Sequence, residues 1–160
     1  MKNMIVKGIF PACIISLMFA CNDNKGGSSS VDKEQIKKEI QAKEDSFAAV
    51  YNSGQLRNIG YYADDATSYL QNTAPLVGKE AIKAFLESDL TSNTDKISFQ
   101  TNEIFPSNDG EMVVELGHFT VVDSANNPVN SGNYMALFQK RDGKYVVLRD
   151  MSTSDGVRTQ

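Results

Sequence analysis

The segment YYADDATSYLQNTAPLVGKEAIKAF, Tyr61–Phe85, decides the fold. Within it, DDATSYLQ alternates along the chain, which predicts a β-strand with Ala66, Ser68 and Leu70 on one face. After Gly78, KEAIKAFLESDL has apolar residues at helical spacing and predicts a one-sided helix. The two adjacent acids that open the strand raise the question of whether they form a catalytic acid–base pair.

The chain before this segment predicts two helices. VDKEQIKKEIQAKEDSFAAVYNSG has Asp32 as a helix cap and Gly54 as a stop. Its apolar stripe, in which Lys43 fills one gap, consists of Ile36, Ile40, Phe47, Val50 and Tyr51. We expect the charged face of this helix to be a solvated surface. The next stretch, QLRNIGYY, predicts a short helix that includes Tyr62.

The chain after this segment predicts four strands. KISFQT and EMVVELGHFTVVD (Glu111–Asp123) read as strands, and SANNPVNSG reads as a turn-rich connection. NYMALFQK and KYVVLRDM flank RDG, which is a hairpin signal. The order helix, helix, strand, helix and four strands predicts a single α+β domain whose helices pack on one curved antiparallel sheet.

Composition describes an ordinary globular protein and argues against one class of partner. The 160 residues are enough for one domain with a core, and 41% are apolar and 22% charged. The net charge is −4 and the sequence has no block of Lys and Arg, which argues against binding to nucleic acid.

Residues 1–20 have the layout of a secretory signal peptide. They contain two lysines, no acid and the apolar run IFPACIISLMFA, which is too short to span a bilayer. The run ends in LMFAC and resembles the bacterial lipobox, in which the cysteine, here Cys21, becomes the lipid-bearing first residue. Met18 and Phe19 depart from the usual lipobox residues, and the alternative is an ordinary cleavage site with a spare cysteine. We predict an exported lipoprotein, anchored to a membrane of the bacterial cell envelope.

The cysteine count agrees with lipidation. Cys13 leaves with the signal peptide, so the mature chain has one thiol and can form neither an internal disulfide nor a cysteine metal site. Residues 21–30 are small and polar and predict a flexible tether, which leaves residues 31–160 as the folded domain. Loss of the signal peptide takes the net charge to −6, because it removes two lysines and no acid.

Four motifs together resemble the nuclear transport factor 2-like superfamily: a helix ending in YNSG, then ADDAT, PLVGKEAIKAF and RDGKYVVLRD. The SnoaL-like and ketosteroid-isomerase-like branches are the most similar, and the resemblance covers Asp32–Asp155. It implies a cone, in which a bent sheet wraps around helices and encloses an apolar pocket, and it implies homodimers formed through the sheet. The motifs are not specific to any activity.

The catalytic positions of the isomerase branch lack its chemistry in this chain. By the resemblance, the branch's catalytic aspartate matches Leu70, its hydrogen-bonding tyrosine matches Phe47, and its protonated aspartate falls at Tyr134–Ala136. Leu70 cannot take a proton, Phe47 cannot stabilise an oxyanion, and the third position has no acid. We therefore favour a protein that is not an enzyme of that mechanism.

The paired acids of the opening segment are better explained by structure than by catalysis. Asp64 and Asp65 lie where a strand begins, and acids bond to local backbone groups at such boundaries. Adjacent strand residues also point to opposite faces, whereas the two carboxylates of a catalytic pair must converge. In the isomerase branch, moreover, neither member of this pair is the catalytic acid.

The resemblance implies a pocket lined by Phe47, Tyr51, Ser68, Leu70, Tyr134, Leu148 and Asp150. On the last strand, Val146, Leu148 and Asp150 are expected to share the pocket face. Arg149 then faces solvent or a dimer partner. Asp150 has two interpretations: a general acid whose pKa is raised in an apolar cavity, or a structural carboxylate bonded to a tyrosine hydroxyl, a backbone amide or an arginine.

His118 is the second catalytic candidate and the only histidine. It could act with a serine and an acid, but the sequence has no G-x-S-x-G elbow to hold the serine, and a structural strand histidine is the alternative. A metal site rich in histidine or thiolate is impossible, and neither a calcium loop nor a phosphate loop is present. We expect no metal and no cofactor.

Three functional hypotheses follow. The first is a lipid-anchored domain that binds a small apolar ligand or a protein partner without catalysis. The second is a SnoaL-like or isomerase-like enzyme in which Asp150, with Tyr51, Tyr134 or His118, acts on a small carbonyl compound. The third is a structural or assembly domain whose pocket is vestigial.

Overall fold

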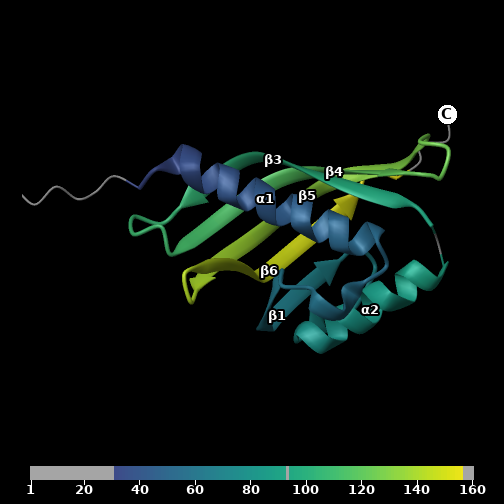
Figure 1. Ribbon diagram of the computed structural model, residues 1–160, viewed down its shortest axis with the longest axis horizontal. Helices are drawn as coiled ribbons and strands as arrows, with labels where there is room; N and C mark the ends of the chain where they lie inside the picture. The colour runs from purple at the N-terminus through teal and green to yellow at the C-terminus, as the bar shows by residue number, and fades with distance from the viewer. Residues whose placement is uncertain (1–30, 93, 157–160) are drawn as a thin grey trace, which may run out of the picture.

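The computed structural model describes residues 31–92 and 94–156, which form one curved six-stranded sheet with two helices packed against it (Figure 1). The expected signal peptide (1–20), the expected lipidation site Cys21 and the rest of the expected tether (22–30) lie outside the described residues. None of the described helices is long and apolar enough to cross a membrane.

The first helix, α1 (Lys33–Asn52), confirms the predicted caps. The side chain of Asp32 accepts a hydrogen bond of 3.0 Å from the backbone amide of Gln35, which satisfies one of the free donors at the helix start. Gly54 follows the helix with a φ of +71°, a left-handed conformation that glycine adopts without strain.

The buried face of α1 differs from the expected stripe at one position. Its buried residues are Ile36, Ile40, Glu44, Phe47, Ala48 and Tyr51. Glu44, four residues after Ile40, occupies the gap that Lys43 was expected to fill, and it is 0% exposed. The expected stripe was therefore wrong at this position, which Glu44 and not Lys43 fills.

The second element is shorter than predicted. Only a single 3₁₀ turn, η1 (Leu56–Asn58), forms where a helix was expected, and Tyr62 is already the first residue of β1 (Tyr62–Leu70). The second helix, α2 (Lys79–Ser92), begins as predicted after Gly78, which has a φ of +87°.

The remaining strands complete the sheet. They are β2 (Leu76–Val77), β3 (Lys96–Pro106), β4 (Met112–Val122), β5 (Pro128–Arg141) and β6 (Lys144–Ser154). Strand β2 was not predicted, and the first residues of β5 lie in the segment that was expected to be a turn-rich connection. The predicted hairpin between β5 and β6 is confirmed. The strand order is β2-β1-β6-β5-β4-β3.

One pairing departs from the expected antiparallel sheet. Strands β1 and β6 run parallel, while the other four pairs are antiparallel. A parallel pair needs a long crossover, which α2 and the strands β3 to β5 supply. The pairing brings the first and last strands of the domain side by side, so residues far apart in the sequence meet there.

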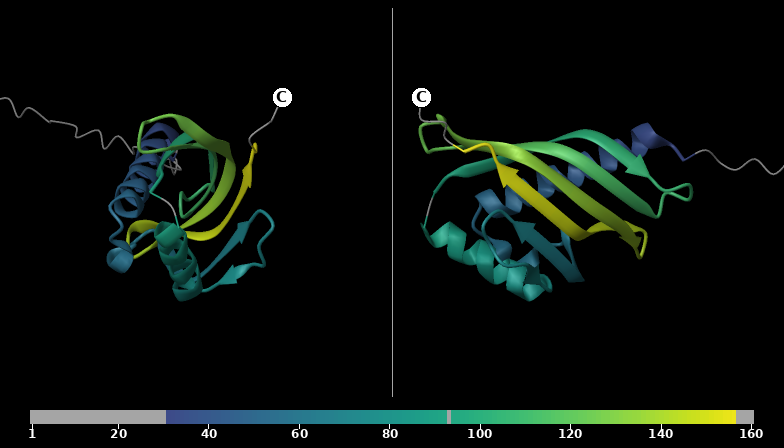
Figure 2. Two further views of the ribbon diagram at one scale, coloured as in Figure 1. Left: turned by 90° about the vertical axis from the view of Figure 1, so that its right-hand side faces the viewer. Right: turned by 180° about the vertical axis from the view of Figure 1, so that it is seen from behind.

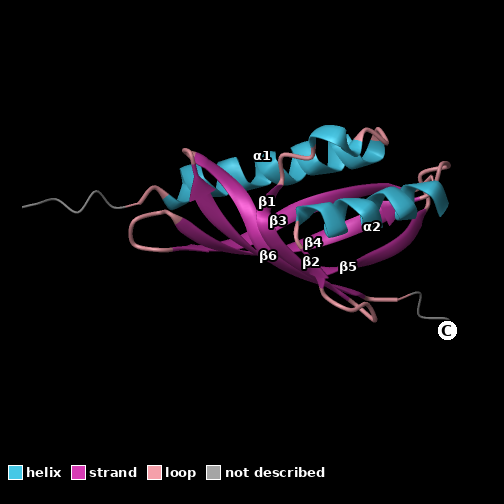
Figure 3. Ribbon diagram, turned by 90° about the horizontal axis from the view of Figure 1, so that it is seen from below, coloured by secondary structure: helices cyan, strands magenta, loops and turns pink. Residues whose placement is uncertain are grey.

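The sheet bends around the helices, as the end-on view in Figure 2 and the view from below in Figure 3 show. Helix α1 packs mainly on β3, and α2 packs mainly on β1. The core includes Ile40, Ile104, Val113, Phe138 and Val147, each 0% exposed. Burial of each such side chain stabilises the fold by about 1.5–3 kcal/mol. The predicted cone of a bent sheet around helices is confirmed.

Two irregularities break the alternation of the strands that meet in the centre. Between β5 and β6, Leu137 pairs with Arg149 but Phe138 pairs with Val147, so Leu148 is an extra residue, a β-bulge. Between β1 and β6, the register shifts between Tyr62 and Thr67, so the ADDA of the opening segment lies in the irregular stretch.

Candidate functional site

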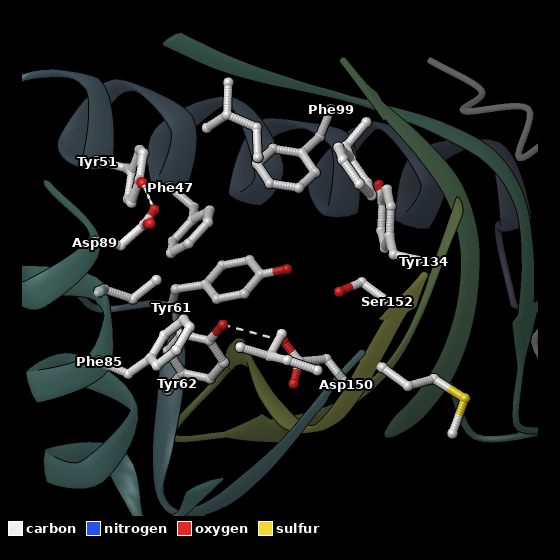
Figure 4. A pocket seen from close by; sticks show the side chains of 15 residues that line it. Phe47, Tyr51, Tyr61, Tyr62, Phe85, Asp89, Phe99, Tyr134, Asp150 and Ser152 are labelled. Atoms are coloured by element: carbon white, nitrogen blue, oxygen red, sulfur yellow. Dashed lines mark hydrogen bonds between the residues drawn. The ribbon is translucent and has the colours of Figure 1, made fainter. Parts of the chain in front are cut away.

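A cavity of about 170 Å³ lies between the helices and the concave face of the sheet (Figure 4). Its lining is mainly aromatic and comprises Phe47, Tyr51, Tyr61, Tyr62, Leu70, Phe85, Leu86, Asp89, Ile97, Phe99, Phe119, Tyr134, Asp150, Met151 and Ser152. A second hollow of about 450 Å³ shares six of these residues and adds polar ones such as Gln71, Asp95 and Asn130. The two are continuous, and we call the second hollow the vestibule.

The structure brings five of the predicted pocket residues together. Phe47, Tyr51, Leu70, Tyr134 and Asp150 all line the cavity. They come from α1, β1, β5 and β6, so the cavity depends on the whole fold and not on one segment.

Two predicted pocket residues are placed differently. Ser68 is 2% exposed and lies behind the cavity wall, where its hydroxyl acts on the carboxyl of Asp150. Leu148 is not among the lining residues, because the bulge at this position interrupts the alternation that was expected to place it beside Asp150. Before the bulge, Val147 is 0% exposed, while Val146, which was expected on the pocket face, is partly buried and does not line the cavity.

His118 lies outside the cavity. In β4, Val113, Glu115 and Phe119 are buried, and His118 has the opposite parity, so it points to the other face of the sheet. It therefore cannot act together with Asp150 on a molecule in this cavity.

Asp150 is held by a tyrosine. Its Oδ2 accepts a hydrogen bond of 3.0 Å from the hydroxyl of Tyr62, and its Oδ1 is buried with no hydrogen bond of good geometry (Figure 4). Burial raises the pKa of the Asp150 carboxyl above its ordinary value, while the hydroxyls of Ser68 and Tyr62 oppose the rise. The hydrogen bond from Tyr62 agrees with the structural interpretation of Asp150. The raised pKa of the carboxyl agrees with the general-acid interpretation.

Behind the cavity, two further acids meet in the core. Glu44 of α1 and Glu115 of β4 are both 0% exposed, and their carboxyls lie in hydrogen-bonding contact. One oxygen of each is taken: Tyr61 donates to Glu44, while Thr101 at 2.5 Å and Tyr134 at 2.9 Å donate to Glu115.

The second oxygens of this pair, Glu44 Oε2 and Glu115 Oε2, have no other partner. Burial raises the pKa of Glu44 to about 9, and the nearby Glu115 adds to the rise. Burial also raises the pKa of Glu115, but the hydroxyls of Thr101 and Tyr134 oppose it. Two buried acids in contact cannot both ionise, so Glu44 keeps a proton at neutral pH and donates it to the Glu115 carboxylate.

A glycine makes room for one of these bonds. Gly117 pairs with Tyr134 across β4 and β5, and a Cβ at Gly117 would collide with the ring of Tyr134. Without that Cβ, the ring lies across the neighbouring strand and its hydroxyl reaches Glu115. Tyr134 thus belongs both to the cavity wall and to the acid pair behind it.

The remaining acid of the lining is at the border with the vestibule. Asp89 of α2 accepts a hydrogen bond from the hydroxyl of Tyr51 and lines both hollows. Nothing in the described part of the chain assembles three or more His, Cys, Asp or Glu side chains into a group that could hold a metal ion.

The paired acids of the opening segment lie on the surface and do not converge. Asp64 pairs with Lys79 at 3.2 Å, and Asp65 forms two hydrogen bonds of 2.6 and 3.0 Å with Arg141. Arg149, which was expected to face solvent or a partner, donates to the backbone carbonyl of Asp65 at 3.1 Å, within the irregular stretch of β1. The structural explanation of the pair fits this arrangement.

Sequence reasoning missed the acid pair and two tyrosines of the site. Glu44 could have been found from its position four residues after Ile40, and Glu115 from its parity with Val113 in a strand. Tyr61 and Tyr62 were assigned to the end of a helix, and only the early start of β1 turns them toward the cavity.

Comparison with known proteins agrees with the fold. Residues 44–148 match the SnoaL-like domain family. A comparison with curated proteins found no match.

Solved structures with the same fold are distant in sequence. A ketosteroid isomerase-like protein from Erwinia carotovora atroseptica is 14% identical, with a TM-score of 0.61 over 76% of this chain and 98% of that one. An NTF2-like protein of unknown function from Shewanella oneidensis is 16% identical, with a TM-score of 0.62 over 73% of this chain and 98% of that one. An NTF2-like protein with a cystatin-like fold from Novosphingobium aromaticivorans is 12% identical, with a TM-score of 0.61 over 79% and 85%. The chain therefore belongs to the SnoaL-like domain family and has the nuclear transport factor 2-like, cystatin-like fold.

Proposed function

We propose that the domain binds a compact, mostly apolar small molecule in the cone cavity and does not catalyse a reaction on it. The observation that carries the proposal is an aromatic cavity of about 170 Å³ that continues into a polar vestibule of about 450 Å³. A cavity of about 150 Å³ in another protein holds one benzene molecule, so the inner cavity suits a single ring and the vestibule suits a polar extension.

The absence of catalysis is supported by how the polar groups are bonded. The isomerase positions are Phe47 and Leu70, which have no proton chemistry. Asp150 already accepts from Tyr62 at 3.0 Å, and Asp89 already accepts from Tyr51. The hydrogen bond from Tyr62 stabilises the charged form of the Asp150 carboxyl, which makes it a weaker base.

A second candidate function is an acid–base enzyme that uses Asp150, which one observation favours. Burial raises the pKa of this carboxyl inside an apolar cavity, and general acids are tuned in the same way. Turnover of a bound compound that is lost in Asp150→Asn, while binding is kept, would establish the enzyme and reject the non-catalytic proposal.

The binding proposal is tested by a thermal-shift screen of the full chain against sterols, aromatic polyketide-like compounds, fatty acids and small amines and carbonyl compounds. A ligand at about 100 times its dissociation constant should stabilise the fold by about 2.7 kcal/mol. Ser152 points into the cavity, so Ser152→Phe should fill it and abolish the shift (Figure 4). Thr153→Phe is the matched control, because Thr153 is the exposed next residue on the same strand. A shift that survives Ser152→Phe would place the ligand elsewhere.

We also propose that Cys21 carries a lipid that anchors the domain to a membrane of the bacterial envelope. The support is the signal-like sequence of residues 1–20 and the small Ala20 before the cysteine. Cys21→Ser should leave the protein out of the membrane fraction. Retention of this variant in membranes, with residues 1–20 still attached, would reject the lipid anchor.

A homodimer through the outer face of the sheet is a further part of the proposal. Leu116, Met135, Met151 and Tyr69 are neighbours in register across four strands, and Met135 and Met151 are 42% and 51% exposed. A row of exposed apolar side chains favours contact with another apolar surface. Sedimentation should show a dimer of the wild-type chain, and Met135→Glu should convert it to a monomer. A wild-type chain that stays monomeric at high concentration would reject the proposed dimer.

A further inference from the structure

The tyrosines around the cavity share one property: each hydroxyl gives its proton to a carboxyl group. The four donor–acceptor pairs are Tyr51–Asp89, Tyr61–Glu44, Tyr62–Asp150 and Tyr134–Glu115. A phenol has one proton, so a hydroxyl that donates to a carboxyl has only its lone pairs left for a ligand. The cavity therefore offers a ligand mainly hydrogen-bond acceptors, with Ser152 as the lining hydroxyl outside these pairs.

The apolar part of the wall has a matching character. Eight of the lining residues are aromatic: Phe47, Tyr51, Tyr61, Tyr62, Phe85, Phe99, Phe119 and Tyr134. The faces of such rings carry partial negative charge and attract cations within about 6 Å of the ring centre. The lining also includes two acids, Asp89 and Asp150. Among the described residues that line the cavity, none is Lys, Arg or His.

The charge of the buried acids also favours a positively charged ligand. The three ion pairs in the described part of the chain are Asp64–Lys79, Glu87–Lys83 and Asp65–Arg141, all with largely exposed carboxylates. None of them includes Glu44, Glu115 or Asp150. Because Glu44 holds a proton at neutral pH, the buried negative charge belongs to Glu115 and Asp150. Buried negative charge without a cation is costly, and a cation brought into the cavity would reduce that cost.

We infer that the ligand is a compact organic cation, a protonated or quaternary amine on an apolar frame of about one ring, with its charge near Asp150 and the aromatic wall. This inference rests on the proposed binding function and names the ligand class. Asp150 is the counter-ion because it lines the inner cavity alone, whereas Asp89 also borders the vestibule. Glu44 and Glu115 lie behind the wall and act from a greater distance. An N–H group of the amine donates to the Asp150 carboxylate, and the rings surround the rest of the charge.

The same features disfavour the other ligand classes of similar size. A carbonyl oxygen would meet tyrosine oxygens whose protons are already used, so it would lose its bonds to water without replacement. A carboxylate would be repelled by Asp150 and Asp89. A neutral hydrocarbon would bind through burial alone and gain nothing from the acids.

Three probes of one shape test the inference: benzylamine, benzyl alcohol and benzoate, each titrated into the full chain at neutral pH by calorimetry. Benzylamine should bind at least about ten-fold more tightly than benzyl alcohol, because a charge-assisted bond and ring contacts replace a neutral bond. Benzoate should show no binding. Benzyl alcohol binding as tightly as benzylamine, or binding of benzoate, would overturn the inference and leave the proposed cavity function intact.

Two variants locate the charge. Asp150→Asn should weaken benzylamine binding more than benzyl alcohol binding and so remove the preference, while a cooperative melting transition of the ligand-free variant reports an intact fold. Asp64→Asn, an exposed acid outside the cavity, is the matched control and should keep the full preference. An unchanged preference in Asp150→Asn would overturn the role of Asp150.

Two outcomes need no variant. Binding of none of the three probes to the wild-type chain, when the screen also finds no ligand, rejects the binding function and the inference together. Ligands in the screen that are all neutral or anionic would reject the amine class alone. If Asp150→Asn fails to fold, the ranking of the three probes on the wild-type chain still decides the question.

Discussion

Two pairs of acids in this domain look alike in composition and behave in opposite ways. Asp64 and Asp65 are adjacent in the sequence, yet they bond to different cations on the surface, Lys79 and Arg141. Glu44 and Glu115 lie on α1 and β4, yet their carboxyls meet in the core with 0% exposure. Neighbouring positions in a strand diverge, while a helix and a sheet can bring distant positions together.

The difference matters because the surface pair is exposed to water and the core pair is not. Around an exposed ion pair, water and salt screen the attraction, and such pairs add little to stability. In the core, a carboxyl has no water to replace a lost partner, so each hydrogen bond of the buried pair is needed. Three substitutions test this contrast, from the largest expected effect to the smallest.

Glu115→Ala should have the largest effect. It removes the acceptor for Thr101 and Tyr134 and the partner of the Glu44 proton, and it opens space in the core. We expect a loss of about 3–5 kcal/mol in the free energy of unfolding, measured by urea denaturation. Glu115→Gln, which keeps the volume, is the control and should lose less. A loss below about 1 kcal/mol for Glu115→Ala would show that the buried network contributes little.

Glu44→Gln should change how stability depends on pH. In the folded chain the pKa of Glu44 is about 9 against an ordinary 4.5, so the folded state holds a proton that the unfolded chain releases between these values. The stability linked to this proton is full below about pH 4.5 and is lost as the pH rises toward about 9. The amide that Glu44→Gln introduces can donate as the protonated acid does, so the variant should be close to wild type in acid and more stable at about pH 9.

The measurement is the free energy of unfolding across this range. Burial also raises the pKa values of Glu115 and Asp150, so part of the decline with pH should remain in Glu44→Gln. Equal pH dependence in the wild type and in Glu44→Gln would contradict the assignment of the shared proton to Glu44.

Asp65→Asn should have the smallest effect. Arg141 lowers the pKa of Asp65 through their hydrogen bonds, but both side chains are exposed to water. We expect a change in melting temperature close to the error of calorimetry, and any change at low salt should shrink at high salt, because salt screens the pair. A loss as large as that of Glu115→Ala would mean that the surface pair holds β1 to the hairpin and would remove the contrast between the two pairs.

The sequence predicted the fold well because its signals are local. The cap at Asp32, the stop at Gly54, the periodic helices and the hairpin turn each depend on a few adjacent residues, and all are found in the structure. The parallel pairing of β1 with β6 was missed, because it joins the two ends of the domain and leaves no local pattern. The short strand β2 was missed because two residues are too few to show a period.

The candidate site was predicted in part, from the family resemblance together with the regular spacing of helix and strand. Phe47, Tyr51, Leu70, Tyr134 and Asp150 line the cavity as expected. The carboxyl pair was missed because a charged residue in an apolar stripe is usually assigned to solvent, and its partner lies on a distant strand. The bonds from tyrosine to carboxyl that define the polarity of the cavity depend on side-chain directions that no spacing predicts.

The extra residue in β6 has a consequence for how this domain can change over generations. Leu137 and Phe138 already pair with Arg149 and Val147, so deletion of Leu148 alone would make the pairing of β5 and β6 continuous and would leave Val147, Asp150 and Ser152 on the faces they occupy now. Deletion of a residue in the regular part of β6, such as Met151, would instead shift the register by one residue and turn the residues beyond it to the opposite face. In descendants of this gene the last strand can therefore lose a residue at the bulge and keep the cavity lining, whereas elsewhere its length is under as much constraint as its composition.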